Sequence, residues 1–115
     1  MPVLHHLALR THDIDRLLAF YQRWFALPIA REARPRSVWL RLDGGAVLML
    51  EQADAHEVPI AHGSRELVAF AVSPEERRHT REALVDAGLL EGETEHTLYF
   101  RDPDGRRVAL SSYAL

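Results

Sequence analysis

The sequence contains no cysteine, which excludes both a disulfide framework and thiolate chemistry. It also lacks any apolar run near the ~18 residues that a membrane-spanning helix requires. A basic segment followed by an apolar one, which would indicate a secretory signal, is missing as well. We therefore expect a cytoplasmic protein without a membrane partner. No block of basic residues occurs and the formal net charge is −3, so nucleic acid is not an expected partner either.

The composition is that of a folded globular domain. Hydrophobic residues make up 47% of the chain and charged residues 27%, a balance that is neither disordered nor membranous. A chain of 115 residues can bury a core but is too short for two ordinary domains. We expect a single domain over residues 1–115.

The first half of the chain predicts a strand, a helix and a hairpin. Residues 3–11 alternate between apolar and polar side chains, as in a strand. Asp13 can then cap a helix, because apolar residues follow it at the spacing of one helical face. These residues are Ile14, Leu17, Leu18, Tyr21 and Phe25. The turn Asp-Gly-Gly joins two further strands at 37–42 and 46–52, and a shorter strand is expected near 28–33.

The second half repeats this plan. Residues 66–72 are predicted to form a strand. The segment Ser-Pro-Glu-Glu that begins at Ser73 is a capping box with proline at the first helical position, which predicts a helix over 74–87. The remaining strands are expected near 89–95 and at 97–101 and 106–113, the last two joined by the turn Asp-Pro-Asp-Gly.

Both halves therefore have the order βαβββ, in modules at 3–52 and 66–113 joined by a connector at 53–65. The turn glycines Gly45 and Gly105 lie 60 residues apart (105 − 45). This common spacing predicts an α+β fold made of two similar modules in tandem.

Two segments carry a family resemblance: HHLALRTHDIDRLLAFYQRWFALPI, with its FY pair, and the closing hairpin FRDPDGRRVAL. Together with the βαβββ repeat they resemble the vicinal oxygen chelate superfamily, which includes glyoxalase I, bleomycin-resistance proteins, fosfomycin-resistance enzymes and extradiol dioxygenases. The resemblance implies a curved mixed sheet around a cavity, with the helices on the outer face. It also implies a divalent metal in active members. Many members are homodimers, and we expect a homodimer here, because an exposed apolar cavity edge usually marks an interface.

Strand alternation assigns the side chains to two faces of the sheet. One face is uniformly apolar and is expected to lie under the helices. The other face mixes polar, aromatic and small side chains, as a ligand-binding cavity does. The candidate cavity residues are His6, Arg10, Trp39, Arg41, Met49, Glu51, Leu67, Tyr99, Arg101 and Ala109.

The resemblance places the family's four metal-ligand positions at His6, Met49, Leu67 and Ala109. Only His6 suits a divalent ion, because leucine and alanine have no donor atom and the methionine thioether is a poor ligand for hard or borderline ions. We therefore expect no stoichiometric metal and interpret His6 as a pocket residue.

A rebuilt metal site would combine His6 with Glu51. Two protein ligands are fewer than the three that are usual in a catalytic zinc site, so such a site would hold a metal weakly. His5 does not help, since adjacent residues of a strand are expected to point in opposite directions.

Three functions remain open. The favoured one is a metal-free binder of a planar or anionic small molecule, held between Trp39, Tyr99 and the arginines of the cavity face. The alternative is a lyase or dioxygenase-type enzyme with an unusual metal site, or an acid–base catalyst that uses His6 or Glu51. A third is a domain that serves only a protein interface. Arg10 and Glu51 could also neutralise each other across the sheet, and the two aromatic residues could be core or dimer contacts.

Overall fold

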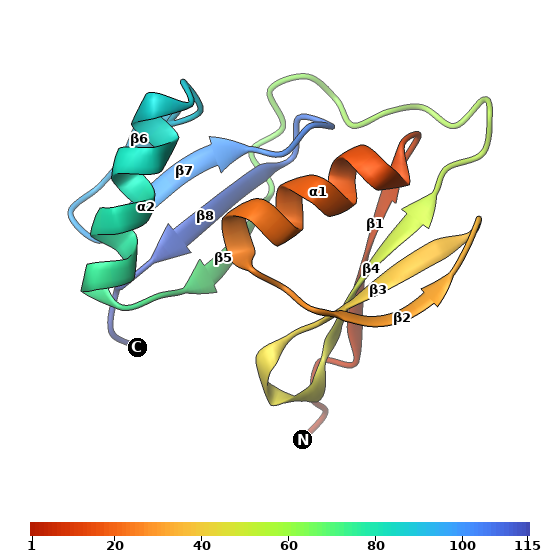
Figure 1. Cartoon of the computed structure of the whole chain (residues 1–115), viewed down its shortest axis with the longest axis horizontal. Helices are drawn as coiled ribbons and strands as arrows, with labels where there is room; N and C mark the ends of the chain where they lie inside the picture. Colours follow the sequence, from red (N-terminus) through yellow and green to blue (C-terminus); the bar gives the residue numbers. More distant parts are fainter. The chain divides into compact units, whose positions relative to one another are not determined.

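The computed structural model describes all 115 residues and divides the chain into two compact units, Met1–Pro59 and Ile60–Leu115. Each unit contains a four-stranded mixed sheet and one long helix (Figure 1). This confirms the predicted α+β fold of two βαβββ modules, and the boundary between the units falls within the predicted connector. Neither helix has the length and apolar character needed to cross a membrane.

Unit 1 forms a sheet with the strand order β1-β4-β3-β2. Strand β1 pairs with β4 in parallel, whereas the other neighbouring strands are antiparallel. Its elements are β1 (His6–Thr11), α1 (Ile14–Phe25), β2 (Ile29–Ala33), β3 (Ser37–Arg41), the short 3₁₀ turn η1 (Asp43–Gly45) and β4 (Val47–Gln52).

Unit 2 repeats this arrangement with the order β5-β8-β7-β6. Here β5 pairs with β8 in parallel, and the remaining pairs are antiparallel. Its elements are β5 (Leu67–Ala71), α2 (Pro74–Asp86), β6 (Gly92–Glu93), β7 (Thr97–Arg101) and β8 (Arg107–Ser111).

Several strands are shorter than the sequence predicts, most of all β6, which spans Gly92–Glu93 where a strand was expected near 89–95. Strand β1 begins at His6 rather than at Val3, and β8 ends at Ser111 rather than at Tyr113. The limits of β1 and β8 match those of the strands beside them. His6, the first residue of β1, pairs with Val47, the first residue of β4. Ser111, the last residue of β8, pairs with the last residue of β5 and the first residue of β7. The sequence pattern of a strand cannot show where its partner strand stops.

The helices begin where the sequence places their caps. The Asp13 carboxylate accepts the backbone N–H of Arg16 at 3.1 Å. In the second unit Ser73 and Glu76 form the complete capping box, with each side chain accepting the other residue's backbone N–H. These bonds satisfy helix-end donors that would otherwise have no partner.

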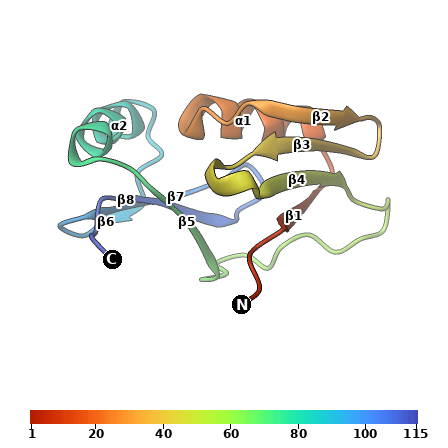
Figure 2. The same ribbon diagram turned by 90° about the horizontal axis from the view of Figure 1, so that it is seen from below.

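Each helix covers the apolar face of its own sheet (Figure 2). Helix α1 contacts β3 and β4, and α2 contacts β7. The side chains in these layers are almost completely buried. They include Leu17, Tyr21, Val38, Leu40, Leu48 and Leu50 in unit 1, and Leu84, Leu98, Phe100 and Val108 in unit 2. The predicted apolar face is therefore the buried one, and the opposite face of each sheet is left for other contacts.

Candidate ligand-binding site

The residues proposed to line a cavity lie on the sheet faces that the helices leave uncovered. In both units they alternate along the strands with the buried apolar residues. Unit 1 carries His6, Arg10, Trp39, Arg41, Met49 and Glu51, and unit 2 carries Leu67, Tyr99, Arg101 and Ala109.

Trp39 occupies the centre of this face in unit 1. It pairs across the sheet with Met49, which in turn pairs with Ala8. The indole N–H donates to the Ser37 hydroxyl at 3.0 Å, and the Arg31 guanidinium lies 5.0 Å from the ring centroid. The hydrogen bond and the cation–π contact fix the ring orientation, so Trp39 forms an ordered, half-buried aromatic surface.

Tyr99 occupies the equivalent place in unit 2. It pairs with Ala109, which pairs with Ala69, so the register of the two modules is the same at this row. The Arg107 guanidinium lies 4.3 Å from the ring centroid. Both units therefore present an aromatic ring backed by an arginine and flanked by small or flexible side chains.

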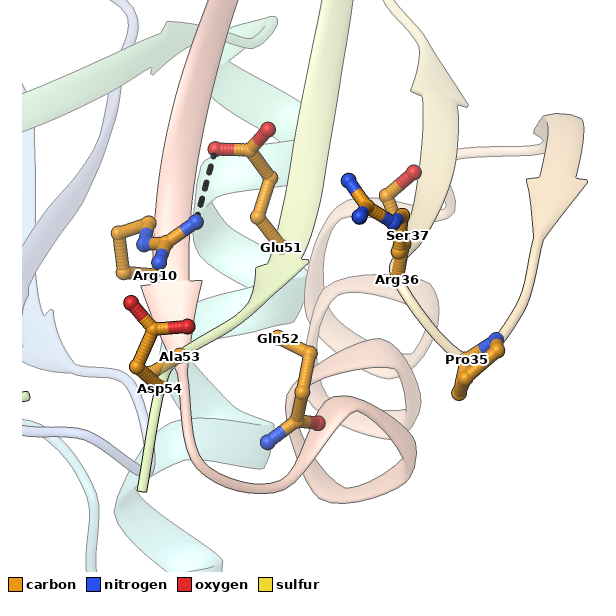
Figure 3. Close-up of a pocket in the computed structure, with 8 residues that line it drawn as sticks. All are labelled: Arg10, Pro35, Arg36, Ser37, Glu51, Gln52, Ala53 and Asp54. Atoms are coloured by element: carbon orange, nitrogen blue, oxygen red, sulfur yellow. Dashed lines mark ion pairs between the residues drawn. The ribbon is translucent and has the colours of Figure 1, made fainter. Parts of the chain in front are cut away.

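Arg10 extends from β1 between two carboxylates. Its Nε and Nη2 atoms donate to Glu57 at 3.0 and 2.6 Å, whereas its Nη1 atom lies 3.7 Å from a Glu51 oxygen. Figure 3 shows Arg10 and Glu51 extending toward one another from adjacent strands. The pairing of Arg10 with Glu51, one of the alternatives that the sequence left open, is present, but the bidentate partner is Glu57.

Glu57 lies in the connector, where the sequence analysis identified no functional residue. Its backbone N–H donates to the Asp54 carbonyl at 3.0 Å, and its carboxylate accepts the Asp54 N–H at 3.3 Å. Its carbonyl oxygen lies 3.0 Å from His12 Nε2. The Arg10 guanidinium holds the pKa of the Glu57 carboxyl at about 2, well below its usual 4.5. The three-residue spacing of Asp54 and Glu57 was the only local signal of this turn.

The Arg101 side chain is also engaged by its own unit. It donates to the Glu91 carboxylate at 2.9 and 3.2 Å, and to the carbonyl oxygens of Ser64 and Gly105 at 2.5 and 3.1 Å. The pKa of Glu91 is lowered by this guanidinium. An open cavity of about 340 Å³ lies beside the pair. Arg41, by contrast, is exposed and its side chain makes no hydrogen bond or ion pair.

A larger open cavity, of about 460 Å³, lies in unit 1 at the carboxyl ends of β1 and β4 and the amino end of β3. Its charged lining residues are Arg10, Arg36, Glu51 and Asp54, and the Ser37 hydroxyl also faces it. In the view of Figure 3, Arg36 and Ser37 lie on the side of Glu51 opposite to Arg10, and the Gln52 side chain extends away from Glu51.

A family model named glyoxalase/bleomycin resistance protein/dioxygenase superfamily matches residues 3–110. The chain therefore belongs to this superfamily, as the first strand–helix segment and the closing hairpin indicated. No curated protein matches the sequence significantly.

Solved structures of similar fold include a lyase and a fosfomycin resistance protein. Lactoylglutathione lyase from Agrobacterium tumefaciens is 22% identical with a TM-score of 0.72, covering 95% of this chain and 92% of that one. The fosfomycin resistance protein FosX from Listeria monocytogenes is 19% identical with a TM-score of 0.83, covering 100% and 94%. A mutant of that FosX, complexed with Mn(II) and 1S,2S-dihydroxypropylphosphonic acid, is 19% identical with a TM-score of 0.80, covering 99% and 91%. At these identities the similarity establishes the fold alone.

The four positions that the resemblance assigns to metal ligands do not carry a suitable donor set. His6 and Met49 share the uncovered face of the first sheet, and Leu67 and Ala109 hold the equivalent places in the second. His6 supplies the only nitrogen or oxygen side-chain donor among them, and Ala109 has no exposed surface. The residues present therefore do not fit a four-ligand site for a divalent ion.

The strand register places His6 and Glu51, the two candidate ligands of a rebuilt metal site, far apart along the sheet. His6 pairs with Val47, whereas Glu51 pairs with Arg10, four residues further along the strand. This separates the two backbones by about 13 Å, which weighs against a shared ion.

The prediction that His5 and His6 point in opposite directions is wrong. Their Nδ1 atoms are 2.9 Å apart and the two rings meet edge to face at 5.1 Å. Strand alternation does not apply to His5 because β1 begins only at His6.

Replacing Arg10 with glutamine should release the Glu57 carboxyl. We expect its pKa to rise from about 2 toward the ordinary 4.5, since the bidentate donor is lost. In the native protein the depressed pKa means that the contribution of this pair to stability is complete above about 4.5 and is lost as the pH falls toward 2. A titration of side-chain carboxyl signals by ¹³C NMR measures both values. Arg34→Gln, which removes the pairs with Asp15 and Glu32 instead, is the control and should leave Glu57 unchanged.

Proposed function

We propose that this protein binds a planar small molecule without the help of a metal ion. The observation that carries the proposal is the aromatic–arginine pair on the uncovered face of each sheet, Trp39 with Arg31 and Tyr99 with Arg107. The arginine occupies one face of each ring. A flat ligand would stack on the other face, since such stacking is favoured for any planar π system.

The surroundings of the two rings support ligand contact over a role in the core. The hydrophobic core lies on the opposite face of each sheet, beneath the helix. Next to the rings are the half-buried Met49, the exposed Ala69 and the buried Ala109, none of which is bulky and branched. A methionine also adapts its shape to a ligand better than a branched side chain does.

The distribution of charge favours a planar ligand over one recognised mainly as an anion. Arg10 and Arg101 are each held in bidentate contact by a carboxylate, Glu57 and Glu91 respectively. Such pairing satisfies the fork of donors that an anionic ligand would otherwise use. Arg36 and Arg41 make no ion pair, but both are exposed, and exposed charges hold an anion weakly.

The absence of a metal requirement is proposed from the donor chemistry of the four ligand positions. Leucine and alanine cannot bind a cation, and a methionine thioether does not replace a carboxylate for Mn(II) or Zn(II). A mutant of FosX from Listeria, whose structure was solved with Mn(II), has a similar fold. The fold alone therefore does not decide whether a protein binds a metal, and the proposal depends on the donor atoms.

Trp39→Leu should weaken the binding of a planar aromatic ligand by about tenfold, because one stacking surface is lost. The control is Trp24→Leu, which removes the other tryptophan, on α1, and should leave affinity unchanged. Isothermal titration with hits from a thermal-shift screen of planar and matched non-planar aromatic compounds gives the comparison. Equal affinity of the two variants, or equal binding of planar and non-planar compounds, would contradict the proposal.

His6→Ala should leave the metal content of the purified protein unchanged, and treatment with a chelator should not reduce ligand binding. Elemental analysis of both proteins is the measurement. About one Zn, Mn, Fe or Ni per chain in the native protein, lost in His6→Ala, would show that a metal site exists and would bring the enzyme hypothesis forward.

We also propose that the protein is a homodimer. The uncovered face of β5 exposes Leu67, Ala69 and Ala71, and Val85 on α2 is half exposed, which is the kind of apolar surface that interfaces use. Light scattering at micromolar concentration should give twice the 13.1 kDa chain mass. A monomer mass would contradict this expectation.

A further inference from the structure

The Glu51 carboxylate lines the unit 1 cavity with one long ion pair as its only charge contact. Its side chain is 30% exposed, and its nearest cationic partner, the Arg10 Nη1 atom, lies 3.7 Å away. No hydrogen bond reaches either of its oxygen atoms. A partly desolvated carboxylate without donors has unused capacity for a charge-assisted hydrogen bond.

Glu57 is the reason that the Glu51 carboxylate receives no hydrogen bond from Arg10. The two donors of Arg10 that are geometrically best placed go to Glu57, at 2.6 and 3.0 Å. Glu57 is itself fixed by the turn with Asp54 and lies 3.0 Å from His12 through its carbonyl oxygen. The connector therefore holds Arg10 away from a full pairing with Glu51.

The cavity that Glu51 faces has the size of a small-molecule site, at about 460 Å³. Glu51 pairs across the sheet with Ser37, whose hydroxyl accepts the Trp39 indole N–H. Trp39 lies two residues along β3 from Ser37, about 7 Å away. The carboxylate and the indole ring thus lie on neighbouring rows of the same sheet face, with the indole N–H reaching back to the row of Glu51.

The other charges of the cavity do not cancel this carboxylate. Arg10 is paired with Glu57, and Asp54 adds a second negative charge. Arg36 is positive and makes no ion pair, but it is exposed, and a hydrated charge attracts a ligand less than a partly buried one does.

We propose that Glu51 anchors the cationic group of the ligand, so that the ligand class is a planar aromatic amine or amidine. This inference rests on the proposed function, to which it adds the charge of the ligand. The ammonium or amidinium donates to the Glu51 oxygens, and the attached ring lies on Trp39. Glu57 is a positioning residue, since it acts through Arg10.

The experiment compares two fluorescent probes of the same shape, 9-aminoacridine, a planar cation at neutral pH, and acridine-9-carboxylate, a planar anion. We expect the cation to bind more tightly. Glu51→Gln should weaken binding of the cation by about tenfold and leave binding of the anion unchanged. Glu32→Gln makes the same charge change on β2, where Glu32 pairs with Arg34, and should alter neither affinity.

The role of Glu57 is tested separately. Glu57→Gln should weaken binding of the cation, because Arg10 loses its bidentate carboxylate and can pair more closely with Glu51. The double variant Glu57→Gln with Arg10→Gln should regain the affinity for the cation, because Arg10 no longer competes for Glu51. If Glu57 has only a structural role, the loss of affinity will persist in the double variant.

The outcomes separate the two proposals. Binding of the anion but not of the cation, with the anion lost in Arg36→Gln, would overturn the inference and leave the planar ligand in place. An unchanged affinity of Glu51→Gln for the cation would also overturn the role of Glu51 and leave the planar ligand in place. Failure of both probes to bind would count against the proposed function itself.

Discussion

The parallel pairing of the first and last strand of each module is the constraint on which the rest of the structure depends. Pairing β1 with β4, and β5 with β8, brings together strands that are separated by a helix and a hairpin. Once this register is set, alternation decides the face of every side chain. A shift by one residue would place Leu48 and Leu50 on the uncovered face and bring Met49 and Glu51 beneath α1.

The same register sets the chemistry of the uncovered faces. It brings Trp39 next to Met49 and Arg10 next to Glu51 in unit 1, and Tyr99 next to Ala109 in unit 2. Of the four positions that the resemblance assigns to metal ligands, Met49 and Ala109 fall on these rows, and His6 and Leu67 lie on the same sheet faces. In this chain the rows carry aromatic, small and charged side chains on a fold shared with the superfamily.

Much of the fold could be predicted because its signals are local. The cap at Asp13, the capping box at Ser73 and the turn glycines each determine a short segment through its own backbone. The charge partners could not be predicted in this way. Arg10 was expected to face Glu51, but its closest partner is Glu57, 47 residues along the chain in a connector without periodicity. The pairing of Arg101 with Glu91 was missed for the same reason.

The sequence by itself determined the order of the elements, the apolar face of each sheet and the kinds of donor at the metal positions, since composition and alternation carry this information. Only the tertiary structure decided which carboxylate each arginine binds and how the two histidines at the start of β1 are oriented. Long polar side chains reach partners that are distant in sequence, and their choice depends on distances of a few tenths of an ångström. Such distances exist only after the connector has folded back against β1.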